Sequence, residues 1–113
     1  MFKKAKVCDL IIVGAGPAGM AACLYASRQK MNFLVISEDV GGLANYIPQV
    51  ETYLGHHYLS GYELVKKFQS HLDDFKVNVK TGETVKKIDH TRGGFLVTTN
   101  KRNYFGNALL IAS

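Results

Sequence analysis

Residues 14–19 read Gly-Ala-Gly-Pro-Ala-Gly, and this glycine pattern constrains the fold more than any other stretch of the chain. A G-x-G-x-x-G pattern is typical of the turn that joins a buried strand to a helix in a dinucleotide-binding βαβ unit. We expect Gly14 to permit the tight turn, Gly16 to let the backbone approach a pyrophosphate, and Gly19 to allow close packing of helix on strand. A phosphate-binding loop of the G-x-x-x-x-G-K-S/T kind is excluded, because Met20 stands where that motif requires lysine.

The residues around the glycines supply the rest of such a unit. An apolar run at residues 7–13 predicts a buried strand, and Pro17 suits the first position of a helix that continues to about residue 30. A second apolar run at residues 33–37 predicts the next strand, and Glu38 follows it about 20 residues after the last glycine, where these units carry an acidic residue that binds ribose hydroxyls. The alternative is that Glu38 is only an exposed carboxylate at a strand end, with Asp39 in the ribose-binding role.

The remainder of the chain predicts a long loop, one more helix and several short strands. The loop covers residues 38–59, and Ser60 with Glu63 forms a capping box that begins a helix ending near Phe75. Strand-like runs follow at residues 77–79, 85–88, 95–99, 104–105 and 108–112. The segments at residues 81–82, 92–94 and 101–103 that separate the first four runs are typical of hairpin turns. The fold class expected is α/β, a Rossmann-like domain with a parallel sheet, helices and an antiparallel β insertion.

Composition excludes several classes of protein. Hydrophobic residues make up 47% of the 113 residues and charged residues 20%, which is typical of a soluble globular domain. The net charge of +5 is scattered in short pairs, so we expect no nucleic-acid partner. Cys8 and Cys23 form no C-x-x-C and no metal-ligand spacing, so we expect no metal site and a reduced, cytoplasmic protein.

Nor does any segment approach the 18 apolar residues of a membrane helix, so we expect no membrane partner. A secreted lipoprotein is a weaker alternative, because Lys3 and Lys4 precede an apolar run and residues 20–23 read Met-Ala-Ala-Cys.

Four segments resemble a known family. They are residues 9–19 (DLIIVGAGPAG), 37–42 (SEDVGG), 50–55 (VETYLG) and 108–113 (ALLIAS), and together they are similar to the FAD-binding start of thioredoxin reductases and of the flavoprotein subunit of alkyl hydroperoxide reductase. The resemblance implies that residues 1–113 form a partial FAD-binding domain of a flavin-dependent NAD(P)H oxidoreductase. It also implies that any NAD(P)H-binding domain lies outside these residues, so we expect the chain alone to be catalytically poor and assign no catalytic residue.

Carried over by position, the resemblance implies a set of cofactor-binding residues. The pyrophosphate would be held by Gly14, Gly16, Pro17, Ala18 and Gly19, and the ribose by Glu38. Gly41 and Gly42 would lie along the ribityl-flavin side, Val85 would offer its backbone to adenine, and Ala112 and Ser113 would lie near the phosphates. The long loop would wrap FAD, or be poorly ordered without it.

Two departures from the family limit what can be carried over. Leu43 stands where the family often has glutamine and Thr52 where it usually has asparagine, so no hydrogen bond to the flavin ring is assigned to either. A different class of function also stays open, namely a stand-alone nucleotide-binding or interaction module without catalysis. An apolar sheet edge left exposed in a partial domain would favour a homo-oligomer.

Overall fold

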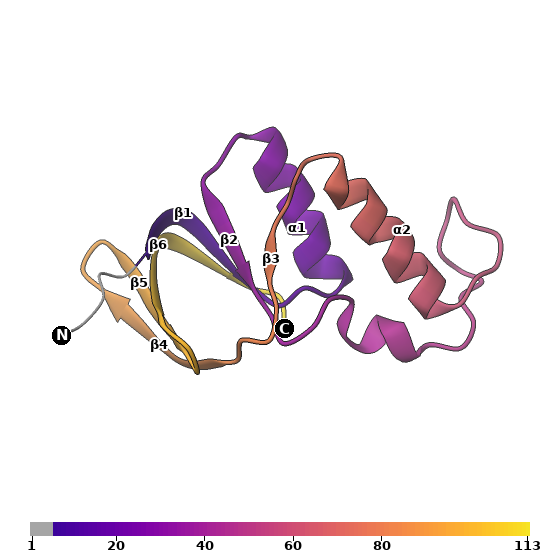
Figure 1. Ribbon diagram of the computed structural model, residues 1–113. Coiled ribbons are helices and arrows are strands. Elements are labelled where there is room, and N and C mark those ends of the chain that lie inside the picture. The colour runs from indigo at the N-terminus through magenta and orange to yellow at the C-terminus, as the bar shows by residue number, and fades with distance from the viewer. Residues whose placement is uncertain (1–5) are drawn as a thin grey trace.

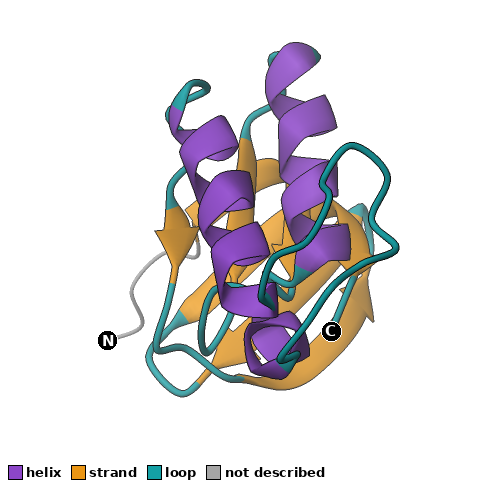
Figure 2. Ribbon diagram, turned by 90° about the vertical axis from the view of Figure 1, so that its right-hand side faces the viewer, coloured by secondary structure: helices purple, strands orange, loops and turns teal. Residues whose placement is uncertain are grey.

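The computed structural model describes residues 6–113, which form one six-stranded sheet with two helices packed on one of its faces (Figures 1 and 2). The elements in chain order are β1 (Lys6–Val13), α1 (Pro17–Arg28), β2 (Phe33–Ile36), the short 3₁₀ helix η1 (Gly42–Tyr46), α2 (Gly61–Asp73), β3 (Val79–Lys80), β4 (Val85–Thr91), β5 (Gly94–Thr99) and β6 (Asn103–Ile111).

The sheet has the strand order β3-β2-β1-β6-β5-β4. Parallel pairing joins β3, β2, β1 and β6, whereas β4, β5 and β6 pair antiparallel. Figure 1 shows the antiparallel part curling away from the helices, while Figure 2 shows α1 and α2 side by side in front of the sheet. The expected α/β fold with a parallel sheet and an antiparallel insertion is confirmed.

β1 is the centre of the core because it is buried on both faces. Ile12 packs with Cys23 of α1 and Val65 of α2 on the helical face. Ile11, its neighbour in the chain, packs on the opposite face with Val97 and Tyr104 of the curled antiparallel part. Both isoleucines are fully buried, as the continuous apolar run of this strand predicts.

The first helix begins as expected but ends slightly early. Gly16 is the N-cap residue and Pro17 the first helical residue, where its missing N–H removes no helical hydrogen bond. α1 ends at Arg28, and Lys30 has a positive φ of 56°, so the backbone has already left the helical conformation before residue 30.

The second helix also begins at the predicted cap. The Ser60 hydroxyl accepts a hydrogen bond from the Glu63 backbone N–H at 3.1 Å. The Glu63 carboxylate reaches back to the Ser60 hydroxyl at 3.2 Å. α2 stops at Asp73, two residues before Phe75, near which its end was predicted, and Phe75 lies 39% exposed beyond it. Val65 of α2 is fully buried, although the sequence did not single it out as a core residue.

Two strand predictions are corrected by the pairing. Residues 104–105 and 108–112 were expected as separate strands, but both belong to β6, which pairs with β5 along its first half and with β1 along nearly its whole length. At Gly106, a Cβ would lie 2.8 Å from the Ile11 side chain, so glycine leaves room for this side chain of the neighbouring strand β1. Thr81 and Gly82 do not turn a hairpin, because β3 pairs with β2 and β4 pairs with β5 at the opposite edge.

The long loop is locally structured. It contains η1 and an antiparallel bridge between Val50 and Leu59. Gly61 joins this loop to α2, because its N–H donates to the Ile47 carbonyl at 2.8 Å and its Cα faces the Ala44 carbonyl oxygen. The close approach of α2 to η1 therefore depends on a residue without a side chain.

The secretion alternative rests partly on Lys3 and Lys4, which lie outside the described residues. Its lipid-attachment candidate, Cys23, is fully buried in α1, and burial raises the pKa of its thiol to about 11. Within residues 6–113, no helix has the length and apolar character needed to cross a membrane.

Replacing Gly61 with alanine tests the contact between α2 and η1. The added methyl would overlap the Ala44 carbonyl oxygen, so we expect the free energy of unfolding to fall by about 1–3 kcal/mol, although alanine has the higher helix propensity. Urea denaturation of Gly61→Ala measures this, with exposed Ser70→Ala on α2 as the control expected to stay within about 0.5 kcal/mol of wild type. A Gly61→Ala chain as stable as wild type would refute the close contact.

Candidate functional site

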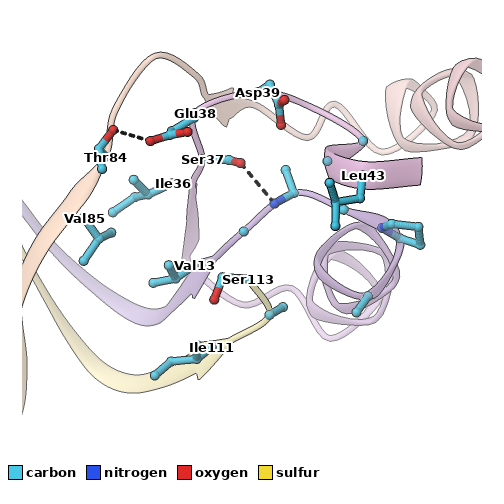
Figure 3. Close-up of a pocket in the computed structure, with 18 of the residues that line it drawn as sticks. Val13, Ile36, Ser37, Glu38, Asp39, Leu43, Thr84, Val85, Ile111 and Ser113 are labelled. Atoms are coloured by element: carbon cyan, nitrogen blue, oxygen red, sulfur yellow. Dashed lines mark hydrogen bonds between the residues drawn. The ribbon is translucent and has the colours of Figure 1, made fainter. Parts of the chain in front are cut away.

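A cavity of about 640 Å³ opens at the carboxyl ends of the parallel strands. β1, β2 and β6 all end at it, at Val13, Ile36 and Ile111 (Figure 3). The chain proceeds from β1 to β2 and β3 on one side, while β6 lies on the other side of β1. Ligands of open α/β sheets bind at such a switch point, outside the carboxyl ends of the strands.

The glycine turn forms one wall of this cavity. Gly14 has a φ of 105°, and a Cβ there would lie 2.6 Å from the Ala112 carbonyl oxygen. A Cβ on Gly19 would overlap the carbonyl oxygen of Gly14. These two glycines therefore allow the start of α1 to lie directly against the ends of β1 and β6.

Gly16 has a different role, because a Cβ there would clash with nothing. Among the described residues outside its own chain neighbours, that Cβ would meet only the Gly41 carbonyl oxygen, at an ordinary contact distance of 3.8 Å. Its φ of −77° is available to any residue, so the local backbone does not require glycine here. The first helical hydrogen bond runs from Met20 N–H to the Gly16 carbonyl at 2.9 Å. The amides that precede Met20 at the start of α1 therefore have no acceptor within the helix.

The opposite wall comes from the segment after β2. The Gly41 N–H donates to the Ala15 carbonyl at 2.7 Å, and the Ala15 N–H donates to the Ser37 hydroxyl at 3.3 Å. These bonds tie residues 37–41 to the glycine turn. A Cβ on Gly42 would lie 3.8 Å from the Gly16 Cα, so the two glycines lie next to each other where the two walls meet.

Glu38 lies at the rim of the cavity with its carboxylate held in place. Its Oε1 accepts a hydrogen bond from the Thr84 hydroxyl at 2.8 Å, and Figure 3 shows the two side chains pointing toward each other. Asp39 also lines the cavity, but among the described residues no side chain donates to its carboxylate. Of the two candidate acids, Glu38 is therefore the one with a fixed orientation.

Below Glu38 the cavity is apolar. Its aliphatic lining comes from the carboxyl ends of β1, β2 and β6, at Val13, Ile36 and Ile111, and from Val85 and Ile88 of β4. Sequence reasoning found only Val85 of this set, because the others were assigned simply to strands. The signal that could have found Val13, Ile36 and Ile111 is their place at strand ends, since the carboxyl ends of parallel strands meet at one edge.

Glu83, next to Thr84, is a buried carboxylate in the cavity wall that the sequence did not single out. It is 4% exposed and accepts hydrogen bonds from Thr99 at 2.8 Å and from the Tyr104 hydroxyl at 2.9 Å. Burial alone would raise the pKa of Glu83, but these bonds and the nearby charges of Arg102 and Lys101 outweigh it and lower the pKa. The residue anchors the wall as an ionised acceptor.

The structure brings ten of the eleven candidate cofactor residues to this one cavity. They are Gly14, Gly16, Pro17, Ala18, Glu38, Gly41, Gly42, Val85, Ala112 and Ser113. Gly19 lies outside the lining, beneath Gly14, where it serves helix packing. Leu43 lines the cavity and is 86% exposed, whereas Thr52 lies elsewhere in the long loop. Residues 6–113 contain no group of side chains arranged to hold a metal ion.

A glycine turn, a strand-end acid and a cavity at the switch point together define a nucleotide-binding α/β domain of the Rossmann kind. The family model for pyridine nucleotide-disulphide oxidoreductases matches residues 8–113, and the chain belongs to that family. Within the family it is a thioredoxin reductase-like FAD-binding segment. The family resemblance of the sequence is thereby confirmed.

Individual relatives agree. The chain is 36% identical over 112 residues to the 34.2 kDa protein in rubredoxin operon of Clostridium pasteurianum, and 34% identical over 114 residues to thioredoxin reductase of Listeria monocytogenes. These alignments cover 98% and 100% of this chain but 36% and 35% of the relatives. The chain therefore spans about a third of the length of the curated relatives it matches.

Solved structures give the same result. The T. acidophilum thioredoxin reductase superposes with a TM-score of 0.87 at 36% identity, covering 94% of this chain and 35% of that one. The enzyme from Streptococcus pyogenes superposes with a TM-score of 0.89 at 32% identity, covering 97% and 36%.

The buried hydrogen bonds of Glu83 predict a dependence of stability on pH. Because its pKa is lowered in the folded chain, its contribution is present above the ordinary value of 4.5 and is lost as the pH falls through the lowered value. Burial and the bond to Glu83 raise the pKa of Tyr104 to about 12 from 10.0, so that contribution is present below pH 10.0 and is lost as the pH rises through about 12.

Tyr104→Phe removes a donor to this buried carboxylate. We expect the free energy of unfolding at neutral pH to fall by about 1–3 kcal/mol, and acid unfolding to begin at a higher pH. Urea denaturation across the pH range measures both effects. Tyr25→Phe is the matched control, because Tyr25 is 67% exposed, and equal losses in the two variants would contradict a special role for the buried bond.

Proposed function

We propose that this chain supplies the adenosine and pyrophosphate half of an FAD site in a flavin-dependent NAD(P)H oxidoreductase of the thioredoxin reductase kind. The proposal is carried by one observation: the glycine turn, Glu38 and an apolar lining all meet in the same cavity at the start of α1. The activity itself would require NAD(P)H bound by residues beyond those described here.

The pyrophosphate is assigned to the start of α1. Helix amides that lack an intrahelical acceptor, together with the positive end of the helix dipole, stabilise phosphate oxygens without a basic side chain. The absence of side chains at Gly16 and Gly42, which both line the cavity, supports the close approach of backbone that this contact needs. None of the described residues lining the cavity is a lysine, arginine or histidine, so these amides are the principal source of positive charge.

The adenosine is assigned to the other end of the cavity. Glu38 accepts hydrogen bonds from the two ribose hydroxyls, and a carboxylate has enough lone pairs to do so while keeping its bond from Thr84. The aliphatic lining from Val85 and Ile36 offers the adenine ring an apolar surface. Glu38, Asp39 and Glu83 would repel phosphates from this end, which favours one orientation of the nucleotide.

The flavin end is assigned to the side of Gly41 and Gly42. Both glycines line the cavity, and Leu43 continues its wall toward solvent. When bound, the flavin supplies hydride and electron transfer, and the protein binds and orients it.

Exposed Leu110 and Ile111 on β6 fit an apolar contact with further protein, whether the rest of a longer chain or a second copy.

Flavin binding tests the proposal directly. We expect the purified chain to show bound flavin absorbance, or to gain thermal stability with millimolar FAD, because a ligand at 100 times its dissociation constant stabilises a fold by about 2.7 kcal/mol. Gly16→Val fills the space reserved for the phosphates, so FAD affinity should fall at least tenfold while the ligand-free unfolding temperature stays near wild type.

Ala21→Val, an exposed change on the same helix outside this cavity, is the control expected to keep FAD binding. A wild-type chain with neither flavin absorbance nor a thermal shift would rule out the proposal. So would a Gly16→Val chain that binds FAD as wild type does.

The choice between Glu38 and Asp39 is tested separately with ADP. A hydrogen bond to a charged group contributes about 1.5–3 kcal/mol, so we expect Glu38→Ala to weaken ADP binding by roughly 10- to 100-fold. Asp39→Ala, the matched control, should change it by less than about threefold. Isothermal titration calorimetry measures both, and the reverse order would assign the ribose to Asp39.

A further inference from the structure

The hydrogen bond from Thr84 to Glu38 joins two segments that lie 46 residues apart in the chain. Glu38 follows β2, whereas Thr84 immediately precedes β4 at the far edge of the sheet. The backbone holds the segments together as well, because the Gly82 N–H donates to the Glu38 carbonyl at 3.0 Å and the Glu83 N–H donates to the Ser37 carbonyl at 3.4 Å. Thr84 thus reaches Glu38 from a fixed position.

Thr84 is itself held from the opposite side by the turn between β5 and β6. Its N–H donates to the Asn100 side-chain oxygen at 2.9 Å, and its carbonyl accepts from the Asn100 N–H at 3.1 Å. The preceding residue, Glu83, is anchored by Thr99 and Tyr104. The half-buried Thr84 thus follows directly on a buried group of hydrogen bonds, which joins Glu83 to Thr99 and Tyr104 of the antiparallel insertion.

We infer that Thr84 is a positioning residue for ribose recognition, which orients the Glu38 carboxylate so that it accepts from both ribose hydroxyls. This inference rests on the proposed function. Under this inference, selectivity for a ribose with both hydroxyls depends on the antiparallel insertion, because the Thr84 hydroxyl orients Glu38 without needing to touch the nucleotide.

The physical reason is the freedom of an exposed glutamate. Glu38 is exposed and has three rotatable side-chain bonds, so without a partner its carboxylate would sample several rotamers and lose entropy on binding. The Thr84 hydroxyl occupies one lone pair of Oε1 and leaves Oε2 free, together with the second lone pair of Oε1. Two adjacent hydroxyls can then bind a carboxylate that is already oriented.

Thr84→Val tests this role, because valine keeps the shape of threonine and removes only the hydroxyl, while the backbone bonds to Asn100 remain. The full 113-residue chain is titrated by calorimetry with ADP and with 2′,3′-dideoxy-ADP, which lacks both ribose hydroxyls. We expect Thr84→Val to reduce the ratio of the two affinities by about three- to tenfold through weaker ADP binding, with dideoxy-ADP binding unchanged.

Two controls separate this role from a structural one. Thr84→Ser keeps the hydroxyl and should restore the wild-type ratio, and Thr81→Val, at an exposed threonine outside the cavity, should leave it unchanged. An unchanged ratio in Thr84→Val overturns the inference, as does an equal loss for both nucleotides, which would mean that Thr84 supports the cavity as a whole. A wild-type chain that binds neither nucleotide overturns the proposed function first, and this inference with it.

Discussion

The contact between the start of α1 and the ends of β1 and β6 is the constraint on which the rest of the structure depends. Gly14 and Gly19 carry no side chains, so backbone meets backbone where helix and strands join. The Ala112 N–H closes the same junction by donating to the Val13 carbonyl at 2.7 Å. Because the helix starts so close to the sheet, its first amides lie at the carboxyl ends of the strands, where the cavity opens.

The charges around the cavity divide it into two ends. Partial positive charge lies at the start of α1. Three carboxylates, those of Glu38, Asp39 and Glu83, lie in another part of the cavity wall. The orientation proposed for the dinucleotide follows this division. The chain has a net charge of +5, but none of the described residues lining the cavity is basic, so the start of α1 is the main source of partial positive charge there.

Sequence reasoning succeeded where structure is local and failed where it depends on pairing between distant strands. The βαβ opening, the capping box at Ser60 and the antiparallel character of the insertion were all readable from short patterns. The division of β6 into two strands was wrong, because only the pairing with β1 shows that residues 104–111 form one continuous strand. The hairpin expected at residues 81–82 failed for the same reason, since its flanking strands pair at opposite edges of the sheet.

The sequence by itself predicted the glycine turn and the acid that follows β2, because the places of Gly14, Gly16 and Glu38 follow from their spacing along a single βαβ unit. Only the tertiary structure decided which groups complete the cavity. Glu83 and Thr84 belong to an irregular segment without periodicity, and they reach Ser37 and Glu38 because the chain before β4 returns to the end of β2. Contacts made across 46 residues leave no pattern in the local sequence, so their chemistry appears only once the sheet has formed.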